Sequence, residues 1–145
     1  MNDPFLEHWF GGFEAALKSM SEDERATLLR PCAKACSESY PAKIFREAYT
    51  NSSDQADFLR RIEAEMGGVV IERVDESHVV FVYPECYCDL YTRGWVSTPA
   101  LCECSRYNLQ ANFEAAMGPS CVTVTLEQTV LGGAESCRLR VSFMD

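Results

Sequence analysis

The sequence has few basic residues, few histidines and no long apolar run. Its 145 residues contain 13 lysines and arginines against 22 aspartates and glutamates, so the formal net charge is −9. Nucleic acids and anionic membrane surfaces bind proteins through clustered Lys and Arg side chains, so we expect neither as a partner. Residues 1–20 lack the basic start and unbroken apolar segment of a signal peptide or membrane span, which predicts a cytoplasmic protein.

Sequence motifs of common enzymes are also missing. The glycine pairs at 11–12 and 132–133 match no phosphate-binding loop. A cysteine nucleophile needs a nearby base, but the histidines are His8 and His78, and neither lies beside a thiol in the sequence. The residues therefore leave open whether the protein is an enzyme.

Length and composition predict one domain. A chain of this length that is 47% hydrophobic can bury a sizeable core without cross-links. No internal repeat or long linker interrupts the sequence. We predict a single α+β domain over 1–145, with a helical part over 1–68 and a ββαββ part over 69–145. In the second part a β-hairpin, a helix and a second β-hairpin form a four-stranded antiparallel sheet packed with helices.

The start of the chain carries two helix signals. Over 5–20 the apolar residues recur every three or four positions after Asp3, which supplies a capping oxygen. Ser21 and Glu24 have the spacing of a capping box and open a second helix. Within that helix Pro31 predicts a kink or a restart.

Two further helices are expected before the sheet begins. A short helix follows Pro41, and a longer one opens at 52–55 and ends at the glycines of 67–68. The apolar face of the longer helix comprises Phe58, Ile62 and Met66.

Two hairpins are predicted in the second part. β-Branched and aromatic residues fill 69–74 and 78–83 around a short turn, and apolar residues alternate with polar ones over 122–127 and 137–143. Between the hairpins the apolar spacing predicts a helix over 105–117.

A four-residue loop would set the register of the second hairpin. It pairs Leu126 with Leu139, Val124 with Val141, Val122 with Phe143 and Gln128 with Cys137, and it places Cys121 near Met144. The apolar faces of both strands then agree.

Eight cysteines are the least usual feature of the sequence. The segment YPECYCDLYTRGWVSTPALCECS over 83–105 carries four of them in two Cys-x-Cys pairs, Cys86 with Cys88 and Cys102 with Cys104. In a reducing cytosol such thiols are metal ligands, reactive groups or small buried residues rather than disulfides.

A metal site would use these thiols directly. Zinc takes about four soft ligands in a tetrahedron, and two Cys-x-Cys pairs complete that set. We predict zinc or another divalent metal bound by Cys86, Cys88, Cys102 and Cys104, with Cys32, Cys36 and Cys137 as secondary candidates. Burial is the competing explanation, because free cysteine behaves as a small hydrophobe and Cys137 lies on the inward face of its strand. Both explanations stay open at this point.

Aromatic residues surround the same segment. Tyr87, Tyr91, Trp95 and Tyr107 would give an apolar surface with hydroxyl and indole groups. Such a surface suits a pocket for a small-molecule ligand, and it equally suits a plain core. These four residues are our candidate ligand-binding residues.

The order of elements and the segment over 86–143 resemble a known family. They resemble the 4-vinyl reductase domain superfamily, small-molecule-binding modules related in fold to TRAPP-type trafficking subunits and haem nitric-oxide sensors. They are also similar to the L-2-amino-thiazoline-4-carboxylic acid hydrolase family, which shares a cysteine-rich exit from the first hairpin, a cysteine before the helix, and a Gly-Gly turn leading to a cysteine.

The resemblance implies site residues and excludes one cofactor. It places Cys86, Cys88, Cys137 and either Cys102 or Cys104 at cysteine positions of the family pattern. The haem sensors carry a proximal histidine in a C-terminal helix and a Tyr-x-Ser-x-Arg pattern. Neither is found in this sequence, so we expect no haem.

We therefore expect a domain that binds or senses a small molecule or zinc at a cysteine-lined site. The alternative is a metal-assisted hydrolase of a small cyclic amidine, in which the metal activates water. A homodimer is a further candidate, for which an exposed apolar patch on the N-terminal helices would be the sign.

Overall fold

The computed structural model of the chain describes residues 3–144 and begins with the two predicted helices. Helix α1, Pro4–Ser19, is capped by Asp3, whose carboxylate accepts the backbone N–H of Phe5 at 3.0 Å. Helix α2, Glu22–Ser39, begins with the expected capping box, in which Ser21 and Glu24 each accept the backbone N–H of the other. Both predicted helix starts are confirmed.

Of the two alternatives predicted at Pro31, a kink or a restart of the helix, the restart is wrong. Helix α2 runs without interruption through Pro31. A proline within a helix removes one backbone hydrogen bond, and the packing of the helix outweighs that loss here. The next helix, α3, Pro41–Asn51, begins directly after Tyr40, with proline at its first position as the sequence predicts.

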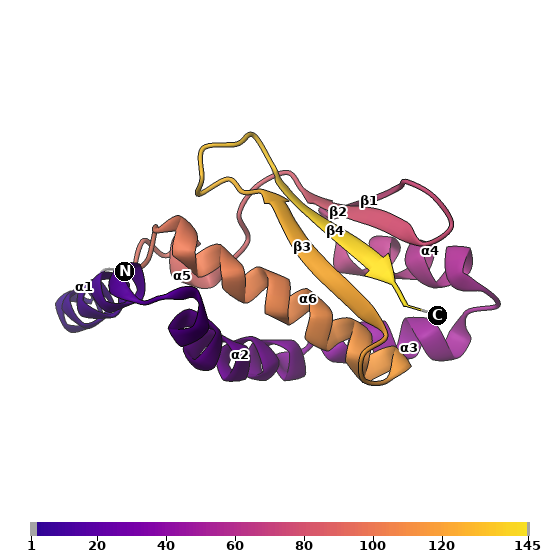
Figure 1. Cartoon of the computed structure of the whole chain (residues 1–145), viewed down its shortest axis with the longest axis horizontal. Helices are drawn as coiled ribbons and strands as arrows, with labels where there is room; N and C mark the ends of the chain where they lie inside the picture. The colour runs from indigo at the N-terminus through magenta and orange to yellow at the C-terminus, as the bar shows by residue number, and fades with distance from the viewer. Residues whose placement is uncertain (1–2, 145) are drawn as a thin grey trace.

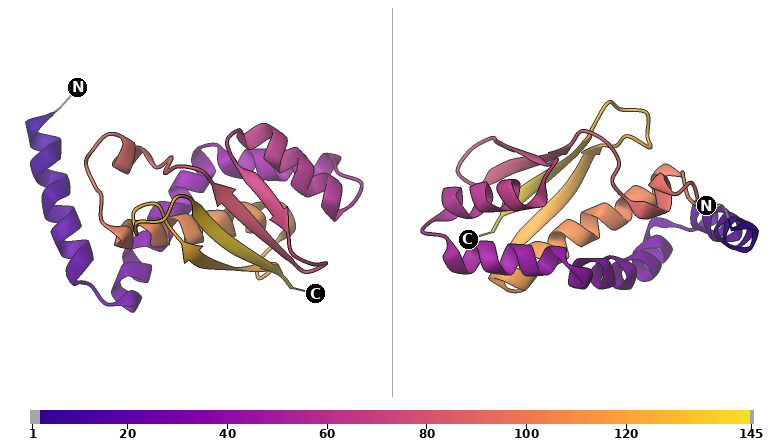
Figure 2. Two further views of the ribbon diagram at one scale, coloured as in Figure 1. Left: turned by 90° about the horizontal axis from the view of Figure 1, so that it is seen from above. Right: turned by 180° about the vertical axis from the view of Figure 1, so that it is seen from behind.

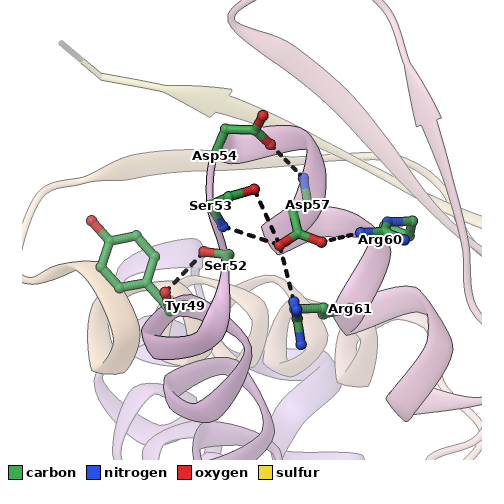
Figure 3. Close-up of polar contacts among 7 residues, drawn as sticks. All are labelled: Tyr49, Ser52, Ser53, Asp54, Asp57, Arg60 and Arg61. Atoms are coloured by element: carbon green, nitrogen blue, oxygen red, sulfur yellow. Dashed lines mark hydrogen bonds and ion pairs between the residues drawn. The ribbon is translucent and has the colours of Figure 1, made fainter.

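Helix α4, Gln55–Met66, begins in a network of polar contacts around Asp57 (Figure 3). Asp54 caps the helix by accepting the N–H of Asp57 at 2.8 Å. The Asp57 carboxylate accepts the N–H of Ser53 at 3.0 Å and the Nε–H of Arg61 at 3.1 Å, and it also contacts Arg60. These donors, led by the Ser53 amide, lower the pKa of Asp57 to about 2.

The predicted four-stranded antiparallel sheet is confirmed. Its strands are β1, Val70–Arg73; β2, His78–Tyr83; β3, Val122–Gln128; and β4, Cys137–Phe143. Their order in the sheet is β1-β2-β4-β3, so the two hairpins join through the β2–β4 pair. The first strand of each hairpin therefore lies at an edge of the sheet, and the second strand of each hairpin lies at its centre.

The register of the second hairpin agrees with the prediction over most of its length. Val122 pairs with Phe143, Val124 with Val141 and Leu126 with Leu139. The N–H of Met144 donates to the carbonyl of Cys121 at 2.9 Å, as expected from their predicted proximity.

One pair differs from the predicted register. An irregularity after Leu126 places Gln128 opposite Arg138, so the expected pair of Gln128 with Cys137 is wrong. A bulge adds one residue to one strand, and alternation of side chains cannot reveal it. The Cys137 thiol instead accepts the backbone N–H of Val130 at 3.3 Å.

Between the hairpins lie three helical segments. They are α5, Asp89–Thr92; a 3₁₀ turn, Pro99–Leu101; and α6, Cys102–Met117. Thr98 caps the 3₁₀ turn by accepting the N–H of Ala100 at 3.4 Å. The long helix thus begins three residues before the predicted start, which places Cys102 and Cys104 in its first turn.

The helices gather on one face of the sheet (Figure 1). Helix α6 lies beneath β3 and beside α2, whereas α1 lies at one end of the molecule, away from the sheet (Figures 1 and 2). The opposite face of the sheet carries ion pairs, such as that of Arg138 with Glu72 at 2.7 Å. Among residues 3–144 no helix combines the length and the apolar character that a membrane crossing requires.

Phe113 of α6 is the centre of the main core. Its ring lies 5.0 Å from Phe45, 6.0 Å from Phe58, 5.7 Å from Phe81 and 5.6 Å from Phe143, measured between ring centroids. These aromatic partners come from α3, α4, β2 and β4. One side chain therefore joins both hairpins to the helical layer.

Replacing Phe113 should test this arrangement. We expect Phe113→Ala to lower the free energy of unfolding by about 3–5 kcal/mol, because the cavity cannot close between four rings. Tyr40→Ala is the control, since Tyr40 is largely exposed, and it should change stability by less than about 0.5 kcal/mol. Urea denaturation measures both, and an equal loss in the two variants would contradict the central position of Phe113.

Candidate functional site

Helices α2 and α6 pack through a narrow stripe that contains buried polar groups. We call this contact the α2–α6 seam; its residues are Leu29, Ala33 and Ser37 on α2 and Asn108 and Asn112 on α6. Ser37 and Asn112 are only 2% and 1% exposed, and the Ser37 hydroxyl donates to the Asn112 side-chain oxygen. The Asn108 amide donates to the carbonyl of Ala33 at 3.3 Å, and Asn112 donates to Asn108 at 3.2 Å. These bonds fix the two helices in one register.

The seam leaves two flanks of α2 free for different chemistry. Successive residues of a helix turn by about 100°, so Arg30 and Lys34 lie on one flank of the stripe and Cys32 and Cys36 lie on the other. All four side chains belong to exposed residues. The seam thus separates a cationic side from a thiol side.

On the thiol side the fold brings together cysteines that are distant in the sequence. Burial raises the pKa of Cys104 to about 12, with smaller contributions from three nearby thiolates. These neighbours are Cys36, Cys88 and Cys32. These four thiols therefore lie close enough to influence one another's ionisation, although they come from α2, the segment after β2 and the first turn of α6.

A second group of thiols continues from the first. Burial raises the pKa of Cys102 to about 11, and three nearby thiolates contribute in the same direction. These neighbours are Cys137, Cys86 and Cys88. Because Cys88 contributes to both pKa shifts, these seven thiols influence one another electrostatically in a series that runs from α2 to β4. We call it the thiol band; it comprises Cys32, Cys36, Cys86, Cys88, Cys102, Cys104 and Cys137.

The thiol band does not converge on a single point. Over the described range 3–144, no group of three or more His, Cys, Asp or Glu side chains is placed to hold a metal ion. The pKa contributions connect the seven cysteines that the sequence proposed as primary or secondary ligands in series, without placing them around a common point. Zinc binding thus stays a prediction. Cys121, at the start of β3, is not among the neighbours of the band.

The histidines lie apart from the thiols. His8 Nδ1 lies 2.8 Å from the carbonyl oxygen of Pro4 on α1, and His78 Nδ1 lies 2.8 Å from the Asp75 carboxylate at the turn of the first hairpin. Each ring therefore has a local partner that accounts for its position.

The four aromatic candidates occupy different surroundings. The Tyr87 hydroxyl donates to the Gly68 carbonyl at 3.4 Å, and Tyr91 is exposed on α5. Trp95 stacks on Phe10 of α1, with ring centroids 5.2 Å apart. Among the four, Tyr107 alone lines the large groove described next.

A groove with a cavity volume of about 700 Å³ lies on the cationic side of the seam. We call it the cationic groove; it is formed by α2, α3, α6 and β3. Its charged lining residues are Arg30, Lys34, Arg46 and Arg106, with the acidic Glu38 and Glu114. Four positive charges against two negative ones make this groove cationic on a protein whose net charge is −9.

Tyr107 holds two of the cations in place. The guanidinium carbons of Arg30 and Arg106 lie 5.0 and 4.8 Å from the centroid of its ring. Arg106 also donates to the Tyr107 hydroxyl at 2.9 Å and lies 3.9 Å from Glu103. Cation–π contact of this kind fixes a guanidinium group without neutralising it. The Nε–H of Arg106 is buried and has no hydrogen-bond partner among the described residues.

The other three cations of the groove differ from Arg106 in having no acidic partner among residues 3–144. Arg30, Lys34 and Arg46 form no ion pair with any residue between 3 and 144. Of the two acids, Glu114 accepts hydrogen bonds from the Gln110 amide at 3.3 Å and the Ser120 N–H at 3.4 Å. The groove therefore has cationic groups available for an anion.

Sequence reasoning did not find the cationic groove. The spacing of Arg30 and Lys34 on one helix face was an available signal, but Arg46 and Arg106 are distant in the sequence. They line the same groove only because α3 and α6 both pack beside α2, and that packing depends on the seam.

Comparisons with known proteins support the fold. No family model matches the chain, and no curated protein matches it. A solved structure of trafficking protein particle complex subunit 3 from Naegleria fowleri, covalently bound to palmitic acid, is similar with a TM-score of 0.51 and 10% sequence identity. The similarity covers 97% of this chain and 94% of that chain. At this identity it shows the fold alone.

The raised pKa of Cys104 predicts the reactivity of this thiol. In folded, reduced protein we expect Cys104 to react with iodoacetamide at least about tenfold more slowly than exposed Cys32, because only the thiolate is nucleophilic. The Cys104 rate should increase about tenfold per pH unit up to about pH 10, since its pKa of about 12 leaves it almost fully protonated below that. Mass spectrometry of the alkylated peptides measures both rates. A Cys104 rate that levels off below about pH 9 would contradict this assignment.

Proposed function

We propose that this protein is a small-molecule-binding domain and that the cationic groove binds an anionic ligand carrying a phosphate or carboxylate group. The observation that carries this proposal is the pair of guanidinium groups of Arg30 and Arg106 on the Tyr107 ring. Each guanidinium group is positioned by the ring but not neutralised by it, so each keeps its charge and N–H donors for an anionic ligand.

The size of the groove supports a small ligand. Its volume of about 700 Å³ lies within the range of about 300–1,000 Å³ that is usual for small-molecule sites. Ala42, Ala111, Ala115 and Val124 provide apolar wall between the charged groups. A ligand with an anionic group and a small apolar part therefore fits this lining.

The net charge of the whole protein narrows the class of ligand that we expect in the groove. A net charge of −9 repels large polyanions over the whole surface, whereas the groove attracts a small anion locally. This combination favours a compact anionic molecule over a nucleic acid.

The similar trafficking subunit suggests one specific probe. That protein is covalently bound to palmitic acid. In this chain four cationic side chains line the groove, which favours an anionic head group over a long apolar tail. Palmitate therefore serves as a probe beside pyrophosphate and citrate, which carry the anionic groups without the tail.

Binding should depend on the two guanidinium groups. We expect pyrophosphate or citrate to bind the wild-type protein, and Arg30→Gln or Arg106→Gln to weaken binding at least about tenfold, because each substitution removes a charge-assisted hydrogen bond. Isothermal titration calorimetry measures the affinities. Arg93→Gln is the matched control, since Arg93 lies 5.7 Å from the Trp95 ring and outside the groove.

Two outcomes would overturn this proposal. One is the absence of binding for all three probes at millimolar concentration. The other is an equal loss of affinity in Arg30→Gln and Arg93→Gln, which would indicate a nonspecific charge effect. Binding of palmitate without binding of pyrophosphate or citrate would indicate an apolar ligand site rather than the cationic groove.

Zinc binding at the thiol band is the second candidate, supported by the electrostatic influence that links its thiols in series. Movement of the segment after β2 would be needed to place four of them around one ion. This candidate predicts about one zinc ion per chain in freshly purified, reduced protein, and loss of zinc in Cys88→Ser/Cys104→Ser. Cys121→Ser is the control outside the band and should keep the metal. Wild-type protein without zinc would remove this candidate.

The predicted alternative of a metal-assisted hydrolase is less favoured by the geometry. Such an enzyme needs a metal with an open coordination position and a base near the substrate. His8 and His78 each lie beside a local partner, away from the groove and the thiol band. We therefore propose a binding domain rather than an enzyme.

A further inference from the structure

Helix α1 is attached to the rest of the molecule by one face. Phe10 stacks on Trp95, and Leu17 is buried against the segment that precedes α6. Glu14 accepts hydrogen bonds from the backbone N–H and the hydroxyl of Ser97, both at 3.3 Å. The helix stands at the end of the molecule and borders solvent along much of its length (Figure 2).

A neighbouring face of α1 exposes large apolar side chains. Phe5 is 69% exposed and Trp9 is 56% exposed, although both are aromatic. Gly12 and Ala16 follow them on the same face, at steps of three and four residues, and both are exposed. We call these four residues the α1 stripe. It contains no charged side chain.

The α1 stripe is complementary in shape to itself. Its two large residues lie at the start of the helix and its two small ones lie towards the end. In an antiparallel pair with a two-fold axis between residues 10 and 11, Phe5 faces Ala16 of the second copy and Trp9 faces Gly12 of the second copy. A β-carbon placed on Gly12 would meet no atom of this chain within 4 Å, so the space above Gly12 is open.

We propose that α1 binds α1 of a second copy of this chain in this antiparallel arrangement, with each aromatic side chain seated over a small residue of the other helix. The same patch then serves both partners, as two-fold symmetry requires. The inference is independent of the cationic groove, because no residue of α1 lines it.

The size of the contact predicts a weak dimer. A single pair of helices of 16 residues lies near or below the lower limit of about 1,200 Å² that stable complexes bury. The aromatic side chains supply most of the apolar area. We therefore expect a dimer that dissociates in the micromolar range.

Sedimentation velocity over about 5–500 µM tests the proposal. We expect the wild-type protein to change from monomer to dimer within this range. Trp9→Glu should raise the dissociation constant at least about 30-fold, as expected for an aromatic residue at the centre of an interface. Tyr40→Glu is the matched control, because Tyr40 is 57% exposed and lies outside α1, and it should leave the dimer unchanged.

A second pair of variants tests the antiparallel register. Gly12→Trp fills the space that receives Trp9 and should abolish the dimer. Trp9→Gly/Gly12→Trp exchanges the large and small positions and should restore the dimer. Circular dichroism confirms that each variant is folded. A wild-type protein that stays monomeric at the highest concentration, or a Gly12→Trp variant that still dimerises, would overturn the proposal.

Discussion

The buried hydrogen bond between Ser37 and Asn112 is the contact on which the site depends. Two polar side chains in an apolar interface are costly unless they bond to each other, so this pair allows α2 and α6 to meet in one register only. Ala33 beside them is small enough to bring the two helix backbones close together. A further hydrogen bond, from the Asn108 amide to the carbonyl of Ala33, supports the same register one turn away.

That register determines what lies on the two sides of the seam. On one side Arg30 and Arg106 meet at the Tyr107 ring, and on the other Cys36 and Cys104 become neighbours. The two sides have opposite chemical character. Arg30 has no ion-pair partner among the described residues, whereas burial raises the pKa values of Cys36 and Cys104 and keeps these two thiols largely protonated. The cationic side is therefore the more favourable place for a ligand.

Much of the architecture could be predicted from local patterns. The helix caps at Asp3 and Ser21 and the pairing of Leu126 with Leu139 follow from hydrogen bonding and alternation within a few residues. The predictions from local sequence were wrong at Pro31 and at Cys137. Helix α2 continues through Pro31 because its packing is stronger than the loss of one hydrogen bond, and a bulge shifted Cys137 by one position.

The sequence by itself determined the α+β class, the two hairpins and the amphipathic faces of the helices, because each depends on residues that are near neighbours along the chain. It also indicated that the cysteines were unusual. Tertiary structure alone decided that seven thiols form a band without a common centre, and that Arg46 and Arg106 line one groove with Arg30. Those outcomes depend on which helix packs against which and in what register, and no local pattern records a contact between residues that are 60 or more positions apart.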